Sequence, residues 1–372
     1  MLDKITLNNF AAFEKLSIDF SPKVNVIIGE NSCGKTQLLK AAYVLSTTGT
    51  AFSGDEKITK SKVEQVLTDR LIHVYKPTEN KLGELYNRGG SGKAEITAEF
   101  TSSGQLGAEF TSRSSKVQVK GNHKTPFSQG AVYLPAKEVL SFLDGISNEN
   151  SDPATLNRLF DMTYFDLTDK LLEQQRDEVE EKTVWFREAI TNQLGGQFLF
   201  DDTTVCFKEG VYKDYKDKHA SKSYFAPSSK HSLSATMTAE GYRKIGVLQR
   251  LLENQAIGTG VNGPLLWDEP ESNMNPKLMQ MLVDIILELS RKGQQIIIAT
   301  HDYVLLKWFD LLADKGKDDY VRFHTLYRDQ KSEKIKLETT DNYREITPNS
   351  IADSYSDLTD HEISKTMGGL GK

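Results

Sequence analysis

The chain has 372 residues, with 46 Lys and Arg against 52 Asp and Glu and a formal net charge of −6. With 38% hydrophobic and 26% charged residues, the composition excludes a disordered or fibrous protein, and the length allows two to three domains or one large one. The two cysteines, Cys33 and Cys206, exclude a disulfide framework or a cysteine-based zinc site. No apolar run is long enough to span a membrane, and the N-terminus lacks the pattern of a signal peptide. We therefore expect a cytoplasmic protein with no membrane partner and no general coating of nucleic acid.

The N-terminal part predicts a sheet that leads into a strand–loop–helix unit. Alternating apolar residues over 5–20 predict half-buried strands, and the unbroken apolar run 24–28 predicts a strand buried on both faces. A Gly-rich turn at 29–34 and a helix over 35–45 follow. Beyond them, the pattern predicts a helix around 60–74, antiparallel strands at 95–100, 107–110 and 116–119, and an apolar strand at 131–134.

The second half predicts a helical insertion and then alternating helices and strands. The helical pattern over 154–194 would reach about 60 Å as one helix and half that as a hairpin, so it forms a short arm at most. We predict an N-terminal lobe over 1–144, a helical insertion over 145–195 and a C-terminal lobe over 196–372. In the last of these, we expect strands at 197–213, 264–267, 295–299, 321–327 and 334–338, and helices at 239–254, 276–291, after 302 and, briefly, near 351–355.

The strongest motif is a phosphate-binding loop that fits the pattern G-x-x-x-x-G-K-[ST]. Its glycines let consecutive backbone N–H groups converge on a phosphate, and the following helix adds its positive end. Lys35 would reach the β- and γ-phosphates, and the Thr36 hydroxyl would ligate Mg²⁺. We expect Cys33 to be a small residue that fills its position. The predicted nucleotide-binding residues are Gly29, Glu30, Asn31, Ser32, Cys33, Gly34, Lys35, Thr36 and Gln37.

Two further apolar strands end in polar residues. Asp268 and Glu269 follow the strand at 264–267, and His301 follows the strand at 295–299. In open α/β folds, ligands bind at the carboxyl ends of the strands, so Asp268 suits a Mg²⁺ site and Glu269 suits the polarisation of an attacking water. His301 would bond the γ-phosphate. For each segment alone, an ordinary solvated strand end is the alternative.

Together, these residues carry a resemblance to a known family. The run from Ile5 through Asn8-Asn9-Phe10, the loop 29–36, Asp268-Glu269-Pro270-Glu271 and Ala299-Thr300-His301-Asp302 resemble the heads of ABC-type ATPases. Within them, they resemble the RecF/SMC/Rad50 branch and its bacterial relatives, the overcoming-lysogenization-defect (OLD) and anti-phage defence ATPases. The resemblance implies an α/β P-loop NTPase fold of ABC/SMC-head type, with a mixed central sheet, an antiparallel β lobe and a short helical insertion.

The resemblance also implies roles for single residues. Lys35 and Thr36 would bind phosphate and Mg²⁺ of ATP, Asp268 would be the second acidic metal residue, Glu269 the catalytic base and His301 the switch histidine. ABC heads complete the site with a signature sequence from a second subunit, which implies a homodimer or a higher oligomer built of dimers. The equivalent stretch here is 234–241, and only Thr238 and Gly241 match the expected pattern; with Glu240 they form the predicted contact in trans. For the glutamine that couples Mg²⁺ to the other lobe, Gln129 and Glu138 are both candidates.

The resemblance favours an ATPase that controls a separately encoded nuclease or toxin, in bacterial anti-phage defence. The insertion has no sustained heptads for a long coiled coil, and no dense acidic cluster typical of a metal nuclease follows His301. One alternative is a slowly hydrolysing, nucleotide-gated scaffold, and another is a DNA-repair ATPase of the RecF type. The lysine- and tyrosine-rich segment 208–230 fits either a nucleic-acid track or a solvated hairpin. We interpret Trp185 and Phe186 as a helix-packing face.

Overall fold

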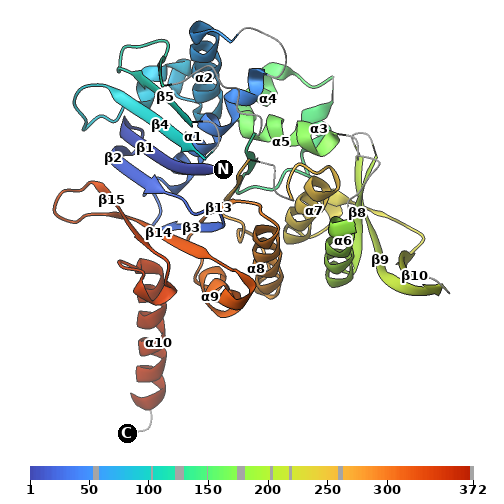
Figure 1. The fold of residues 1–372 in the computed structure, drawn as a ribbon. Coiled ribbons are helices and arrows are strands. Elements are labelled where there is room, and N and C mark those ends of the chain that lie inside the picture. The colour runs from blue at the N-terminus through green and yellow to red at the C-terminus, as the bar shows by residue number, and fades with distance from the viewer. Residues whose placement is uncertain are drawn as a thin grey trace.

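A six-stranded sheet forms the centre of the molecule (Figure 1). The computed structural model describes residues 1–52, 58–101, 104–121, 130–148, 150–173, 181–201, 204–217, 220–258 and 263–368. Five of the central strands run parallel, and the last one joins an edge in the antiparallel direction. In sheet order, the strands are β15 (Ile335–Thr340), β14 (Val321–Arg328), β3 (Val24–Gly29), β13 (Ile296–Thr300), β12 (Leu265–Asp268) and β7 (Val132–Leu134).

Both faces of this sheet are buried, because alternate residues of each central strand enter different cores. In β13, Ile296 and Ile298 face one apolar cluster, whereas Ile297 and Ala299 face the other. The first cluster is covered by α8 (Pro276–Arg291) and α9 (Tyr303–Leu312). This two-sided burial explains why the predicted strands 24–28, 264–267 and 295–299 have unbroken apolar runs instead of alternation.

The other face is covered by the helix that follows the phosphate loop. This helix, α1 (Lys35–Thr47), is buried around most of its circumference, between the central sheet and a second, antiparallel sheet. The second sheet has the order β2-β1-β4-β5-β6, and α2 (Lys60–Tyr75) packs beside α1. Its strands are β1 (Leu2–Phe10), β2 (Phe13–Asp19), β4 (Ala94–Phe100), β5 (Gly104–Phe110) and β6 (Gln118–Gly121). The predicted antiparallel β lobe is thus confirmed.

The predicted insertion consists of short helices that pack against the body. They are α3 (Leu143–Ser147), α4 (Pro153–Leu159), α5 (Met162–Leu172) and α6 (Glu181–Leu194). Leu171 of α5 and Phe186 of α6 are buried in the same core as α7 (Glu240–Glu253), which agrees with the interpretation of Phe186; the Trp185 side chain lies outside the described residues. The strand expected over 197–213 is two strands of a third sheet, which comprises β8 (Gly196–Asp201), β9 (Thr204–Asp217), β10 (Ala220–Pro227) and β11 (Leu233–Ser234).

The C-terminal helix differs from its prediction. The short helix expected near 351–355 is wrong in length, because α10 (Ser350–Gly368) has 19 residues and projects away from the body (Figure 1). Its mixture of Ser, Asp and Thr with scattered apolar residues masked the helical period. Short 3₁₀ turns lie at Gly49–Phe52, Thr78–Asn80, Leu82–Leu85, Ala235–Met237, Lys315–Lys317 and Tyr343–Glu345. Among the described residues, no helix combines the length and apolar character needed to cross a membrane.

The contrast between α8 and α10 predicts very different costs for the same substitution. Leu282 of α8 is fully buried, whereas Leu358 of α10 is 64% exposed. Leu282→Ala should lower the free energy of unfolding by about 2–5 kcal/mol, because it leaves a cavity, and Leu358→Ala should change it by less than about 0.5 kcal/mol. Urea unfolding measures both. Equal losses would contradict the packing described for α8.

Candidate functional site

The predicted site residues meet at one edge of the central sheet. Strands β3, β13 and β12 are neighbours, and in their parallel register Thr300 lies beside Ile28 and Asp268 lies beside Ala299. The phosphate loop, Asp268–Glu269 and His301 therefore follow three adjacent strand ends, although more than 200 residues separate the first from the others. The carboxyl edge of a parallel sheet is where α/β proteins bind ligands.

The loop between β3 and α1 accepts only glycine at its two ends. A Cβ atom at Gly29, where φ is 152°, would lie 2.1 Å from the carbonyl oxygen of Leu326. At Gly34, where φ is 86°, it would lie 2.7 Å from the Phe13 ring. Both glycines are therefore required by the tight turn. The Cys33 side chain is buried in the core beneath the loop, as expected of a small filling residue.

Lys35 is buried under the loop that it would share with a nucleotide. Its ammonium donates hydrogen bonds to the carbonyl oxygens of Gly29 at 2.7 Å and of Glu30 at 3.0 Å. Burial lowers the pKa of this ammonium, and the nearby Glu269 carboxylate opposes the shift. The side chain of Gln37 is engaged elsewhere, because its carboxamide oxygen accepts a hydrogen bond from the Ala12 amide in the turn between β1 and β2.

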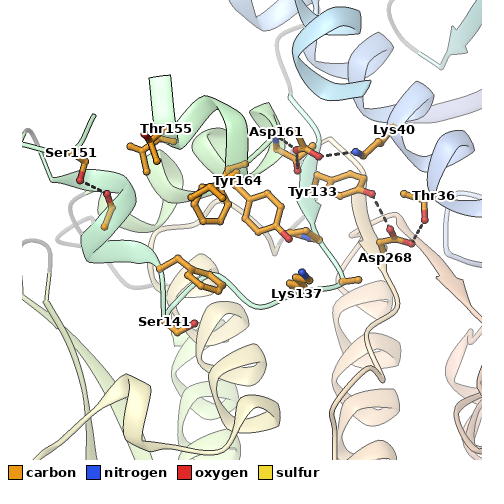
Figure 2. A pocket seen from close by; sticks show the side chains of 18 of the residues that line it. Thr36, Lys40, Tyr133, Lys137, Ser141, Ser151, Thr155, Asp161, Tyr164 and Asp268 are labelled. Carbon is orange, nitrogen blue, oxygen red and sulfur yellow. Dashed lines mark hydrogen bonds and ion pairs between the residues drawn. The ribbon is translucent and has the colours of Figure 1, made fainter. Parts of the chain in front are cut away.

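Two oxygen ligands for a divalent cation lie together at the start of α1. The Thr36 hydroxyl donates a hydrogen bond of 3.1 Å to one oxygen of Asp268, and the Tyr133 hydroxyl donates one of 3.3 Å to the other (Figure 2). Asp268 is 5% exposed, and burial raises the pKa of its carboxyl group. A hydroxyl and a carboxylate are hard oxygen donors of the kind that Mg²⁺ prefers, so the residues fit that ion. Tyr133 was not predicted from the sequence.

Glu269, His301 and Glu271 form a second cluster beside this pair. An oxygen of Glu269 lies 3.1 Å from Nδ1 of His301, and one of Glu271 lies 3.8 Å from the same atom. Glu269 has a left-handed backbone (φ 46°), and its amide bonds to Ala299 O at 2.8 Å. The buried Glu271 carboxylate accepts hydrogen bonds from the Thr300 hydroxyl and from the His301 amide, and burial raises its pKa. Glu271 thus holds the turn that carries His301.

Sequence reasoning also missed Lys244, which fixes the backbone after β12. The residue is 3% exposed, and its ammonium donates hydrogen bonds to the carbonyl oxygens of Glu269 at 3.2 Å and of Ser272 at 2.8 Å. Burial lowers its pKa. A lysine inside the apolar stripe of a helix, between Gly241 and Leu248, was the available signal.

The predicted signature residues lie at the start of α7, before Lys244 in the chain. The Thr238 carbonyl accepts a hydrogen bond from Arg243, Glu240 accepts one from Asn273, and Gly241 packs near Met274. Within the described part of the chain, no hydrogen bond joins these residues to the loop at 29–36.

Of the two candidates for the coupling glutamine, one can be placed. Gln129 lies outside the described residues. Glu138 is buried, with an oxygen 2.9 Å from Arg243 Nε, and it accepts a hydrogen bond from the Ser141 amide. Its carboxylate thus joins the turn after β7 to the signature helix α7.

Comparisons with known proteins agree with this geometry. Residues 1–184, just under half of the chain, match the AAA ATPase domain family. A stretch of 47 residues is 51% identical to the DNA replication and repair protein RecF of Lactobacillus acidophilus, covering 13% of this chain and 12% of RecF. RecF of Bacillus thuringiensis is 53% identical over 45 residues, 12% of each chain. The chain thus matches only about an eighth of the length of these relatives.

Two solved SMC heads share the fold over most of the chain. One, bound to the C-terminal winged-helix domain of ScpA, is 13% identical with a TM-score of 0.50, covering 91% of this chain and 97% of that one. The other, with an extended coiled coil and bound to the C-terminal domain of ScpA, is derived from Pyrococcus furiosus. It is 12% identical with a TM-score of 0.51, covering 97% and 99%. The fold is that of an SMC head. Residues 1–184 match an ATPase domain, and the fold agrees with the ABC/SMC-head type that the motifs predicted.

The crowding at Gly29 predicts that a methyl group there disrupts the loop. Gly29→Ala should lower the free energy of unfolding by about 1–3 kcal/mol, because the new Cβ overlaps a backbone carbonyl that cannot move freely. Gly145→Ala is the matched control, since a Cβ at Gly145 meets no atom within 4 Å. Urea unfolding compares the two. If Gly29→Ala were as stable as the control, the described approach of Leu326 would be wrong.

Proposed function

We propose that this protein binds Mg-ATP between two copies of the chain and hydrolyses it to control a partner protein. The observation that carries the proposal is the meeting of Lys35 and Thr36 with Asp268, Glu269 and His301 at three adjacent strand ends. Each residue type suits its proposed role. The loop amides and Lys35 would neutralise phosphate charge, Asp268 would bind the metal ion, and Glu269 would orient the attacking water.

In this proposal, the chain's own groups act mainly by position and charge. When a nucleotide binds, the Lys35 ammonium would leave the carbonyl oxygens of Gly29 and Glu30 and donate to phosphate oxygens instead. The loop amides would donate to the same phosphates. Thr36 and Asp268 would hold Mg²⁺, which when bound supplies neutralisation of phosphate charge. Glu269 orients the attacking water and takes its proton, and His301, 3.1 Å away, keeps that carboxylate in place. Lys244 and Glu271 hold the two turns that carry these groups.

The second copy would complete the site with the start of its α7. In the described structure, no side chain caps this end, and the Tyr242 and Arg243 amides donate to the Ala239 carbonyl. The amides of Glu240 and Gly241, which come before them, would be the ones offered to a γ-phosphate. Two apolar side chains beside this helix end support burial against another protein surface, because Met237 is 72% exposed and Leu233 is 38% exposed. Thr238, Glu240 and Gly241 would then contact the nucleotide of the partner copy.

The partner that we propose is a separately encoded nuclease or toxin, in bacterial anti-phage defence. The motif resemblance motivates that setting, and the SMC heads of the same fold bind ScpA, a separate protein. A slowly hydrolysing, nucleotide-gated scaffold is the second candidate, because only Thr238 and Gly241 match the expected signature. The RecF-type DNA-repair role rests on a match to an eighth of RecF.

Removing the proposed base should separate binding from hydrolysis. Glu269→Gln keeps the shape of the side chain but cannot accept the proton, so the ATPase rate should fall by at least about 100-fold. The variant should form a stable dimer with ATP and Mg²⁺, seen as a doubled mass in light scattering. Glu79→Gln, at an exposed ion pair with Lys81, is the control. Hydrolysis by Glu269→Gln at the wild-type rate would refute the role assigned to Glu269. If the wild-type protein hydrolyses ATP slowly and its mass does not change when ATP is added, the scaffold is favoured.

A mixing experiment tests whether the site is shared between two copies. Lys35→Ala disables the phosphate loop, and Thr238→Trp blocks the start of α7, so each variant alone should be inactive. In a mixture, half of the dimers combine the two variants, and each of these has one intact composite site. Activity should therefore recover to about a quarter of the wild-type rate. A mixture that stays inactive, although both variants are folded by circular dichroism, would contradict the shared site.

A further inference from the structure

A large cavity begins at the proposed metal ligands and runs beneath the insertion. Its volume is about 860 Å³, and Thr36 and Asp268 line one end (Figure 2). From there it passes Tyr133 and the turn after β7 and reaches α3, α4 and α5. Cavities of roughly 300–1,000 Å³ are the size that binds small ligands. The volume therefore suits a small molecule or a single projecting group better than a docked helix.

The walls under the insertion are aromatic. The ring centroids of Phe142 and Phe160 are 5.5 Å apart, and those of Phe160 and Tyr164 are 5.2 Å apart, so the three rings form a continuous row. Phe142 is 40% exposed, and Leu159, which also lines the cavity, is 68% exposed. Exposed aromatic faces bind other flat rings by stacking, and every nucleobase offers such a face.

Most polar groups of the wall already have partners. Lys40 pairs with Asp161 at 2.7 Å, the Ser141 hydroxyl donates to Glu138, and Thr155 donates to Asp152. Among the described residues, no hydrogen bond or ion pair involves the Tyr164 hydroxyl or the Lys137 ammonium, and both residues line the cavity. Figure 2 shows the Tyr164 hydroxyl on the side of its ring that faces Tyr133 and Asp268.

The two unpartnered groups indicate which atoms a ligand would carry. Tyr164 and Lys137 are donors, so the ligand carries acceptors such as ring nitrogens or carbonyl oxygens. An anionic group inside the cavity is disfavoured, because three carboxylates, those of Asp152, Asp161 and Asp268, line it against two ammonium groups, those of Lys40 and Lys137. The group that enters is therefore an uncharged ring and not a phosphate. We infer that this cavity is a second binding site, which takes a nucleobase, stacked on Phe142, Phe160 and Tyr164, either from a free nucleoside or from a single-stranded nucleic acid.

Two contacts would couple this site to the phosphate loop. Tyr133 and Thr36 bind the two oxygens of the same Asp268 carboxylate, so the cavity and the proposed Mg²⁺ site share a wall. On another wall, the Lys40–Asp161 pair joins α1 to the start of α5. A ligand that shifts either contact changes the affinity for Mg-ATP, and by linkage Mg-ATP changes the affinity for the ligand. This coupling rests on the proposed function, whereas base binding does not.

Fluorescence titration with the riboside of 2-aminopurine tests the site, because stacking on an aromatic ring quenches this probe. Gly145 lines the cavity and a Cβ atom there meets no atom within 4 Å, so Gly145→Trp should place its ring in the cavity and weaken binding at least about tenfold. Gly145→Ala is the matched control and should bind like the wild type. Tyr164→Phe should weaken binding by about threefold to tenfold, because only the hydrogen bond is lost.

The same probe placed in a short single-stranded oligonucleotide distinguishes the two sources of the base. Tighter binding of the oligonucleotide would identify nucleic acid, and equal or weaker binding would identify the free nucleoside. Lys35→Ala, with its phosphate loop disabled, should still bind the probe. The inference is overturned if neither form binds, if Gly145→Trp binds as the wild type does, or if a non-hydrolysable ATP analogue displaces the probe and Lys35→Ala abolishes binding. If the wild-type protein hydrolyses ATP but does not bind the probe, only this inference is overturned. If it binds the probe but does not hydrolyse ATP, only the proposed function is overturned.

Discussion

The hydrogen bond between Thr36 and Asp268 is the contact on which the site depends. It is 3.1 Å long and joins residues that are 232 positions apart, at the start of α1 and at the end of β12. Two features make it form. The parallel register brings the ends of β3, β13 and β12 to one edge, and α1 is held rigidly between two sheets. Burial of Asp268 strengthens its need for partners, which Thr36 and Tyr133 supply.

The insertion helix α5 extends this arrangement to the rest of the molecule. At its start, Asp161 pairs with Lys40 of α1. Further along α5, Asp166 accepts hydrogen bonds from Tyr43 of α1 and from Arg70 of α2. At its end, the Leu171 carbonyl accepts a hydrogen bond from Arg250 of α7. The phosphate-loop helix and the helix proposed to contact a second copy are thus joined through one element.

Particular residues show how far sequence reasoning reached. The loop at 29–36, Asp268, Glu269 and His301 were all predicted as neighbours at one sheet edge, because each follows a buried strand with a clear apolar run. Tyr133 and Lys244 were not identified, although a lysine inside the apolar stripe of α7 was a signal for the second of them, and Glu271 was quoted within its motif without a role. Each becomes significant only through a partner far away in the chain, such as the Glu269 carbonyl for Lys244. The length of α10 was missed for a different reason, because a helix that projects into solvent has no apolar period to reveal it.

The sequence by itself determined the class of fold and which residues form the candidate phosphate loop. Local backbone geometry and the burial of parallel strands leave a direct pattern of glycines and apolar runs. Only the tertiary structure decided which carboxylates are buried, which turn each of them holds, and that an aromatic cavity opens beside Asp268. These properties arise from contacts between segments that are distant in sequence. Such contacts depend on register and packing, and neither leaves a local trace in the order of residues.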